Sequence, residues 1–296
     1  MSTAMIATER DRDRNPDVAE PDDSDLRVLV GDTPLKIVDV AHAPTGYRGD
    51  VSAERQLAVW HDAGVADPER KRLRIDMHTH SEYSPDSRTP LTEQLKALLA
   101  AKIDVVCATD HNTIEGGLRL QEIARDQLRV IVGEEVSSRD GEIIGLFLEK
   151  PIPRDLSAEE TIARIKEQGG VVSVPHPFSR NRLYHIRRSA LERVWQQIDC
   201  IEIFNAREAF AADNRRAEAF AKERNIPGAV ASDAHRVSEI GRAWLEIDDF
   251  ADKASFIASL RTGQVNGRLT GSAIHLATRY DVFRKWLGRR RTKSRA

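Results

Sequence analysis

Five of the nine histidines in this 296-residue chain stand just after short apolar runs, together with acidic residues. The histidines are His78 and His80 after LRID, His111 after VVCATD, His176 after VVSVP, and His235 after GAVASDA. Asp76, Asp110, Glu134/Glu135 and Asp233 stand in the same places. Imidazole and carboxylate ligands suit Zn, Fe, Mn or Mg better than they suit soft metals. The pattern therefore predicts a site for divalent metal ions.

The spacing of these residues agrees with that prediction. In an extended strand, residues i and i+2 point to the same face, so Asp76, His78 and His80 share one face. Asp233 and His235 are spaced in the same way. Any one motif alone could be a solvated strand end, but a set of seven or more ligands exceeds the four of a structural zinc site. We therefore expect two or three ions that hold a hydroxide nucleophile, polarise a phosphoryl oxygen and stabilise the leaving oxygen.

From Arg72 onward, short apolar runs alternate with stretches of helical periodicity. The strand-like runs are LRIDMH, IDVVCA, RVIVGEEV, IIGLFL, VVSVP, CIEIF, GAVAS and AWLEI. The helical stretches are TPLTEQLKALLAA, TIEGGLRLQEIARD, SAEETIARIKEQG, AREAFAADNRRAEAFAKERN and DFADKASFIASLRTG. This alternation predicts an α/β fold with a parallel sheet covered on both faces. Because several strand ends carry candidate ligands, we expect the sheet to close into a barrel whose mouth gathers them.

Local signals refine this picture. Thr89-Pro90 predicts an N-cap followed by proline in the first turn of a helix, and Ser157 with Glu160 predicts a capping box. Cys107 and Cys200 both lie in apolar runs. We expect them to be buried core thiols, because two lone cysteines make neither a disulfide framework nor a zinc cluster.

Composition divides the chain into four segments. Residues 1–25 hold eight acids and three arginines and are expected to be disordered. Residues 26–71 predict a small extension with a hairpin and a helix, 72–278 the barrel, and 279–296 a basic tail. The net charge of -2 does not mark a nucleic-acid or membrane-surface protein. No apolar stretch is long enough to span a membrane and no secretory signal is evident, so we expect a cytoplasmic protein.

The motifs DMHTHSEYSPDS, ATDHNT, GEEVS, VPHPF and SDAH closely resemble, in this order, those of the PHP (polymerase and histidinol phosphatase) family. The resemblance extends from about Arg72 to Thr270. It implies a distorted, TIM-barrel-like (β/α)7 barrel with a di- or trinuclear metal site that hydrolyses phosphate esters. The sequence is most similar to small stand-alone members that dephosphorylate nucleotides or small metabolites.

The resemblance also implies roles for individual residues, which would act in catalysis through the metals. The metal ligands it implies are His78, His80, Asp86, His111, Glu135, His176, Asp233 and His235. Glu134 is the alternative to Glu135, and the motif spacing favours Glu135. Glu142 stands where many relatives have a histidine, a departure that concerns one metal position or a substrate contact there.

Basic residues near the predicted mouth are candidates for binding the substrate. The loop PFSRNRLYHIRRS follows His176, and its Arg180 and Arg182 could clamp a phosphate, although a solvated charged loop is the alternative. Asn205 and Arg207, after CIEIF, are candidate rim residues. Glu202, within that strand, is expected to support the site by a hydrogen bond.

Three other functions remain open. A nuclease or phosphodiesterase would use the same metals and could use the basic C-terminal sequence RKWLGRRRTKSRA. A non-catalytic PHP-like module should have lost ligands that are present here. A metal-dependent amidohydrolase has a similar barrel, but the order of the motifs fits it poorly. The favoured partner is a phosphorylated small molecule.

Overall fold

The structure, a computed structural model, describes residues 72–271. The predicted acidic tail (1–25), the extension (26–71) and the basic tail (279–296) lie outside the described residues.

Strands and helices alternate along most of the described chain, and all eight predicted strands are confirmed. The strands are β1 (Arg72–Thr79), β2 (Val105–Ala108), β3 (Arg129–Ser138), β4 (Gly141–Leu146), β5 (Val171–Val174), β6 (Cys200–Asn205), β7 (Gly228–Ala231), β8 (Ala243–Asp248) and β9 (Gln264–Gly267). The α-helices are α1 (Leu91–Ala100), α2 (Glu115–Ala124), α3 (Ala158–Glu167), α4 (Arg188–Val194), α5 (Ala211–Glu223) and α6 (Lys253–Arg261). Short 3-10 helices are η2 (Arg125–Gln127), η3 (Trp195–Gln197) and η4 (Val237–Glu239). Among the described residues, no helix is long and apolar enough to cross a membrane.

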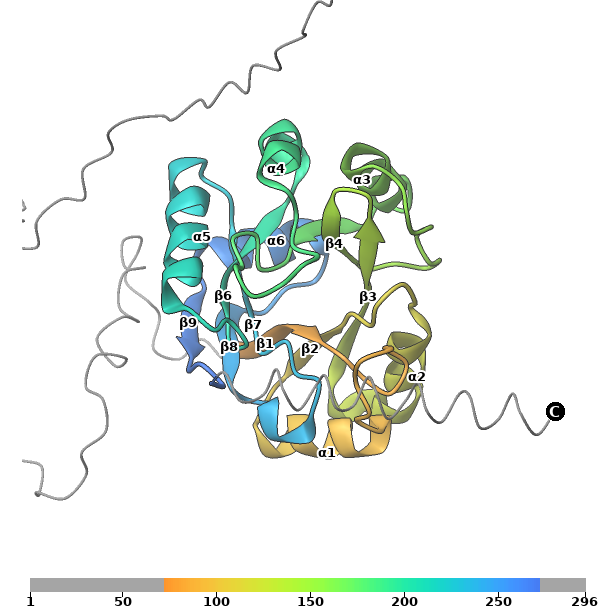
Figure 1. Ribbon diagram of the computed structural model, residues 1–296. Helices are drawn as coiled ribbons and strands as arrows, with labels where there is room; N and C mark the ends of the chain where they lie inside the picture. Colours follow the sequence, from red (N-terminus) through yellow and green to blue (C-terminus); the bar gives the residue numbers. More distant parts are fainter. Residues whose placement is uncertain (1–71, 272–296) are drawn as a thin grey trace, which may run out of the picture. The chain divides into compact units, whose positions relative to one another are not determined.

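The nine strands form one sheet in the order β7-β6-β5-β4-β3-β2-β1-β8-β9. The segment after β7 returns to β1, where Asp233 N–H donates to His78 O and His80 N–H donates to Ala234 O, both at 2.9 Å. These bonds bring the two ends of the seven-strand run together, so the sheet is a nearly closed barrel. Helices α1 to α5 surround it in Figure 1. The predicted α/β barrel is thus confirmed.

The prediction of a wholly parallel sheet is wrong. β1, β2 and β3 are parallel, as are β5, β6 and β7, but β4 runs antiparallel to both β3 and β5. β8 is antiparallel to β1, and β9 is antiparallel to β8. Only Arg139 and Asp140 separate β3 from β4, whereas a parallel connection needs a crossover of a dozen or more residues. The two strands must therefore form a hairpin.

The core is divided by the sheet. Val105 and Cys107 of β2 pack in the larger cluster of buried apolar side chains, whereas Val106 and Ala108 pack with residues of α1 and α2 in a smaller one. This alternation is that of a strand with both faces covered. Cys107 and Cys200 are buried free thiols, as predicted.

Three local predictions have different outcomes. Ser157 and Glu160 form the predicted capping box of α3. Thr89 is not the N-cap of α1, because Pro90 takes that position and the Thr89 hydroxyl donates to the carbonyl of His235 at 2.9 Å. The helix expected from Ala206 begins only at Ala211. Residues 206–210 instead form a loop that brings polar side chains to the barrel mouth.

Candidate metal centre

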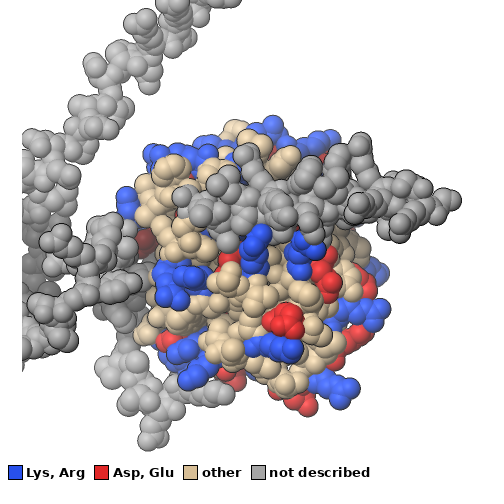
Figure 2. Space-filling model, turned by 60° about the horizontal axis from the view of Figure 1, so that its bottom comes forward, with Lys and Arg blue, Asp and Glu red and all other residues tan. Residues whose placement is uncertain are grey.

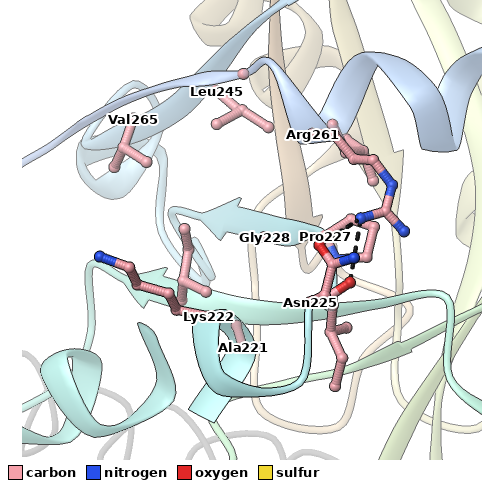
Figure 3. Close-up of a pocket in the computed structure, with 12 residues that line it drawn as sticks. Ala221, Lys222, Asn225, Pro227, Gly228, Leu245, Arg261 and Val265 are labelled. Carbon is pink, nitrogen blue, oxygen red and sulfur yellow. Dashed lines mark hydrogen bonds between the residues drawn. The ribbon is translucent and has the colours of Figure 1, made fainter. Parts of the chain in front are cut away.

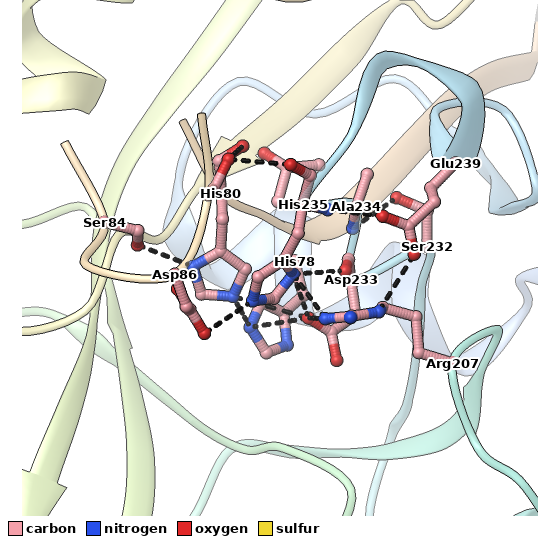
Figure 4. A network of polar contacts seen from close by, with 12 residues as sticks. His78, His80, Ser84, Asp86, Arg207, Ser232, Asp233, Ala234, His235 and Glu239 are labelled. Carbon is pink, nitrogen blue, oxygen red and sulfur yellow. Dashed lines mark hydrogen bonds and ion pairs between the residues drawn. The ribbon is translucent and has the colours of Figure 1, made fainter. Parts of the chain in front are cut away.

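The predicted ligands gather at one end of the barrel, where the strands deliver them. His78 lies in β1, Glu135 in β3, and His176 follows β5. Asp233 and His235 follow β7 and lie beside His78 and His80 in Figure 4. Asp86 and His111 come from the loops after β1 and β2. The structure thus brings all eight predicted ligands together.

Two of the candidate ligands have a backbone that L residues rarely adopt. His176 has φ 28° and Asp233 has φ 52°. Positive φ in non-glycine residues is costly and occurs preferentially at functional sites. At both positions the chain leaves its strand and turns, which places the side chain inside the mouth.

Glu135 is the centre of the cluster. Its Oε2 lies 3.2 Å from His78 Nε2, 3.3 Å from His80 Nε2 and 3.3 Å from His111 Nδ1. Its Oε1 lies 3.2 Å from His176 Nε2. Two atoms that bind one ion at ~2.1 Å are themselves roughly 3.0–3.4 Å apart. The spacing around Glu135 is therefore that of neighbouring ligands on shared cations.

Four overlapping groups of side chains have donor atoms within 4.8 Å of one another. Glu135 belongs to two of the groups, and His78 and His80 each belong to two. The groups are His80-Asp86-His111-His235, His78-His80-Asp233, His78-Glu135-His176 and His111-Glu135-Glu142. Such overlap can hold more than one ion.

Outer hydrogen bonds orient the imidazoles. His78 Nδ1 lies 2.7 Å from Glu202 Oε1, and His80 Nδ1 lies 2.9 Å from Ser84 Oγ. When the outer ring nitrogen donates to an oxygen, the inner nitrogen is left free to bind a metal. Glu202 also accepts from the backbone N–H of His176 at 2.8 Å, so it supports two candidate ligands at once.

Buried acceptor atoms that make no hydrogen bond indicate that the residues fit a cation. Asp233 Oδ2 accepts from Asn205 at 3.0 Å and contacts Arg182. Asp233 Oδ1 makes no hydrogen bond among the described residues and lies 3.4 Å from both His80 Nε2 and His235 Nδ1. Asp86 Oδ1 is also buried and has no hydrogen-bond partner among the described residues. A buried carboxylate oxygen that makes no hydrogen bond is costly, and a bound ion would satisfy it.

The charges in the cluster depend strongly on one another. Burial alone would lower the pKa of His78, but Glu135, Asp233 and Glu202 hold it well above its usual value. Burial also opposes protonation of His111, yet Glu135 and Asp86 raise its pKa to about 10. Conversely, burial would raise the pKa of Glu135, but His78 and His111 hold it well below its usual range. Protons on His78 and His111 therefore offset part of the negative charge of the carboxylates.

Glu142 lies in the cluster although it was not among the predicted ligands. Its Oε1 is 3.7 Å from His111 Nδ1 and its Oε2 is 3.8 Å from His176 Nε2. Burial and the neighbouring Glu135 raise its pKa to about 8. The sequence signal was the departure from the family pattern at this position, which showed an unusual residue but not where its side chain lies.

The two adjacent glutamates of β3 face opposite ways. Glu134 Oε2 accepts from the backbone N–H of Ile152 at 2.7 Å, and burial raises the pKa of Glu134 to about 7. Its side chain has no described contact with the histidines, whereas Glu135 contacts four of them. The alternation of side chains along a strand explains why only one can enter the site.

The four predicted substrate residues lie in different places. Arg182 enters the cluster and contacts Asp233, whereas Arg180 pairs with Asp213 at 2.8 Å. Asn205 is buried and donates to both Glu202 and Asp233.

Arg207 is also buried. Its Nη1 lies 2.6 Å from His235 Nδ1, and its Nε lies 2.9 Å from Glu239 Oε1. Asn205 and Arg207 thus lie behind the ligands rather than on an open rim. Sequence reasoning missed Glu239 and Glu208, because a single glutamate outside a motif gives no signal.

A cavity of about 200 Å³ lies apart from the candidate site (Figure 3). It lies beside Pro227 and Gly228 at the start of β7, whereas the histidines gather beyond the strand ends. Its lining is mostly apolar, from β6, β8, β9 and the helices α5 and α6. None of the candidate site residues lines it.

Two family models match the chain. The PHP domain matches residues 76–169, and the PHP-associated region matches residues 211–265. Two uncharacterized proteins of Methanocaldococcus jannaschii are similar to it. MJ1587 is 39% identical over an alignment of 146 residues that covers 45% of this chain and 82% of that protein. MJ0417 is 31% identical over 180 residues, which are 60% of this chain and 71% of that protein.

Solved structures share the fold at low sequence identity. One is a two-domain protein of Bacteroides vulgatus described as containing a predicted PHP-like metal-dependent phosphoesterase, with TM-score 0.57, 15% identity, and coverage of 70% of this chain and 68% of that chain. Another is PsfC of Pseudomonas syringae, with TM-score 0.55, 16% identity, and coverage of 72% and 98%. Because the PHP domain and PHP-associated models match it and it covers 82% and 71% of the two relatives, at 39% and 31% identity, the chain belongs to the PHP domain family.

Proposed function

We propose that this protein is a metal-dependent phosphoesterase that hydrolyses a phosphomonoester, either a nucleotide or a small phosphorylated metabolite. Two or three divalent ions would be held by the eight predicted ligands, His78, His80, Asp86, His111, Glu135, His176, Asp233 and His235. Glu142 would add a ninth ligand at the group that it forms with His111 and Glu135.

The observation that carries the proposal is the shared position of Glu135. One buried carboxylate lies 3.2–3.3 Å from four imidazoles that come from three separate strand ends. A single structural ion needs only four ligands, so this arrangement fits a bridged cluster. When bound, such ions lower the pKa of a water molecule and neutralise charge on phosphoryl oxygens.

The protein's own groups would bind and orient the substrate. Arg182 is 17% exposed and contacts the cluster from one side, so its guanidinium can reach both the site and an incoming phosphate. A planar guanidinium matches two phosphate oxygens. The phosphoesterase description of the Bacteroides structure agrees with this proposal.

The test is a metal and activity measurement on the full chain. We expect purified protein supplied with Mn²⁺ to bind two or three ions and to release phosphate from part of a panel of phosphomonoesters. The His78→Ala/His80→Ala variant should lose most of its metal binding and most of its phosphate release, because it removes imidazoles from three of the four ligand groups. Lys96→Ala is the control, since this exposed lysine of α1 pairs with Glu93 and belongs to none of the ligand groups.

The same panel addresses the nuclease alternative. Of the predicted basic loop, Arg180, Arg187 and Arg188 pair locally with acidic residues. Basic and acidic side chains are interspersed on the face shown in Figure 2. Cleavage of oligonucleotides that is lost on deleting residues 284–296, without phosphomonoester hydrolysis, would replace the proposal by this alternative. Equal activity of the double-histidine variant would refute metal dependence at this site.

A further inference from the structure

Glu208 is a buried carboxylate behind the candidate site that no ligand role explains. It is 2% exposed and lies in the loop between β6 and α5. Its Oε2 accepts from the Ser179 hydroxyl at 2.9 Å. Its Oε1 faces Arg182 Nε at 3.7 Å, and among the described residues neither of these two atoms has a hydrogen-bond partner.

The contacts that hold the Arg182 side chain are made by its Nη2 nitrogen and not by its Nε. Its Nη2 contacts Asp233 Oδ2 and lies 3.3 Å from Asn205 Oδ1. Asp233 is also a proposed metal ligand, so a bound cation would compete with the guanidinium for the charge of this carboxylate. Glu208 is the described carboxylate that faces the Nε edge of Arg182 and belongs to none of the ligand groups.

We propose that Glu208 is a positioning residue that holds the Nε edge of Arg182, so that the guanidinium presents its remaining N–H groups to a phosphoryl oxygen. This inference rests on the proposed function, because it names the residue that prepares the phosphate contact. A closing of less than 1 Å would turn the 3.7 Å approach into a charge-assisted hydrogen bond. Ser179 fixes the other carboxylate oxygen, which leaves Oε1 directed at Arg182.

The attraction between Glu208 and Arg182 depends on pH, because Glu208 is ionisable. Burial raises its pKa to about 7, and the carboxylates of Asp213 and Asp233 act in the same direction. Arg182 and the Ser179 hydroxyl act in the opposite direction. As pH falls through about 7, Glu208 becomes neutral and its attraction for Arg182 weakens.

The test is the affinity of the full chain, loaded with Mn²⁺, for inorganic phosphate, measured by titration calorimetry. At pH 8 we expect Glu208→Gln to weaken phosphate binding by about tenfold, since the neutral amide loses a charge-assisted contact. At pH 6 the ratio between variant and wild type should approach one, because wild-type Glu208 is then neutral. Because the two affinities are compared at the same pH, their ratio cancels the effect of the titration of phosphate itself.

Two further variants separate positioning from folding. Ser179→Ala leaves Glu208 charged but frees its Oε2, so it should weaken phosphate binding in the same direction and by less. Glu192→Gln neutralises another glutamate paired with arginines, on α4 and away from the cluster, and should leave the affinity unchanged. Thermal melting confirms that each variant is folded.

The outcomes distinguish this inference from the proposed function. If the wild type binds phosphate and a folded Glu208→Gln variant binds it equally at pH 8, Glu208 has no positioning role and the phosphoesterase proposal stands. If the wild type takes up metal but binds no phosphate at either pH, both proposals are overturned. Weakening that is the same at pH 6 and pH 8 would show a structural role only.

Discussion

Arg180 and Arg182 are two residues apart in one loop, yet their side chains have different partners. Arg180 is 48% exposed on its side chain, pairs with Asp213 and lies over the ring of Phe210 at 4.4 Å. Arg182 is turned inward against Asp233. We therefore propose the phosphate contact for Arg182 and not for Arg180, although the sequence predicted it for both.

Substitution should separate the two arginines. We expect Arg182→Gln to lower kcat/KM on a phosphomonoester by about 100-fold, since a charge-assisted phosphate contact contributes roughly 1.5–3 kcal/mol in the ground state and more in the transition state. Arg180→Gln should lower it far less. Steady-state kinetics on both variants is the measurement. A larger loss of kcat/KM for Arg180→Gln than for Arg182→Gln would contradict the assignment of the phosphate contact to Arg182.

Gly116, the second residue of α2, has no room for a side chain. A Cβ there would lie 1.9 Å from Asp110 Oδ2 and 2.8 Å from Ser81 Oγ. Asp110 accepts from the backbone N–H and the hydroxyl of Ser81, both at 2.6 Å. These bonds fix the start of the loop that carries His111.

Gly116→Ala should therefore destabilise the protein by about 1–3 kcal/mol, because Asp110 must move to admit the methyl group. Gly117→Ala is the matched control, since its Cβ would meet Val132 Cγ1 at 3.3 Å and alanine favours the helix. Urea denaturation compares the two. Similar stability of the two variants would show that Asp110 adjusts without cost.

At the scale of elements, β1 has two different partners along one edge. Its first half, from Arg72 to Ile75, pairs antiparallel with β8. Near its end the partner is instead the segment after β7, which bonds to His78 O and to the N–H of His80 just beyond the strand. The change of partner places β8 and β9 beside the barrel rather than in the mouth. It also brings the ligands of β1 and β7 together.

The turn between β3 and β4 ties two helices to the barrel. Asp140 accepts from Ala158 N–H at the start of α3 at 2.9 Å and from Arg187, before α4, at 2.6 Å. Burial opposes its ionisation, but these bonds and Arg193 hold its pKa below the usual 3.8. A group with a lowered pKa in the folded state stabilises the protein above its usual pKa, and this contribution is lost as pH falls through the lowered value.

We therefore expect Asp140→Asn to destabilise the protein by about 1 kcal/mol at pH 7, since half-exposed arginine pairs are weak but the bond to a helix N-terminus adds to them. The difference from wild type should shrink below about pH 4 and vanish once Asp140 is protonated. Thermal unfolding across pH 3–7 measures this. Glu122→Gln, which breaks an exposed pair with Arg119, serves as the control. A difference that does not change with pH would contradict the electrostatic explanation.

At the scale of the whole molecule, the barrel concentrates ionisable groups at one end. His111 has a pKa of about 10 and His78 a pKa well above its usual value, so both carry protons at pH 7 when no ion is bound. A metal ion binds only neutral imidazole.

Metal uptake should therefore release protons, and the affinity should rise with pH between 6 and 8. Calorimetric titration with Mn²⁺ in buffers of different ionisation enthalpy measures the number released, which we expect to be about one or two per protein molecule. The His78→Ala/His80→Ala variant should release fewer. Heat that is independent of the buffer would show that the imidazoles are already neutral.

The sequence by itself determined eight of the nine described strands, the barrel and the types of the candidate ligands, but not the direction of β4 and β8. Alternation along a strand is a local property, so His78 and His80 had to share a face, and only one of Glu134 and Glu135 could enter the site. The order of the motifs indicated the PHP family from the sequence alone, without any tertiary contact. The strands and the directions of their side chains depend on neighbours within a few residues, whereas the family resemblance depends on the order of short motifs.

Only the tertiary structure decided which distant groups meet. Arg182 reaches Asp233 and Glu208, while Asn205 and Arg207, predicted at the rim, are buried behind the ligands. The β3–β4 hairpin brings Glu142 beside His111. Loop directions and buried charge pairs are set by residues 25 to 50 or more positions apart, as in the pair of His235 with Arg207. Spacing along the chain cannot give such contacts, because they result from the packing of the whole barrel.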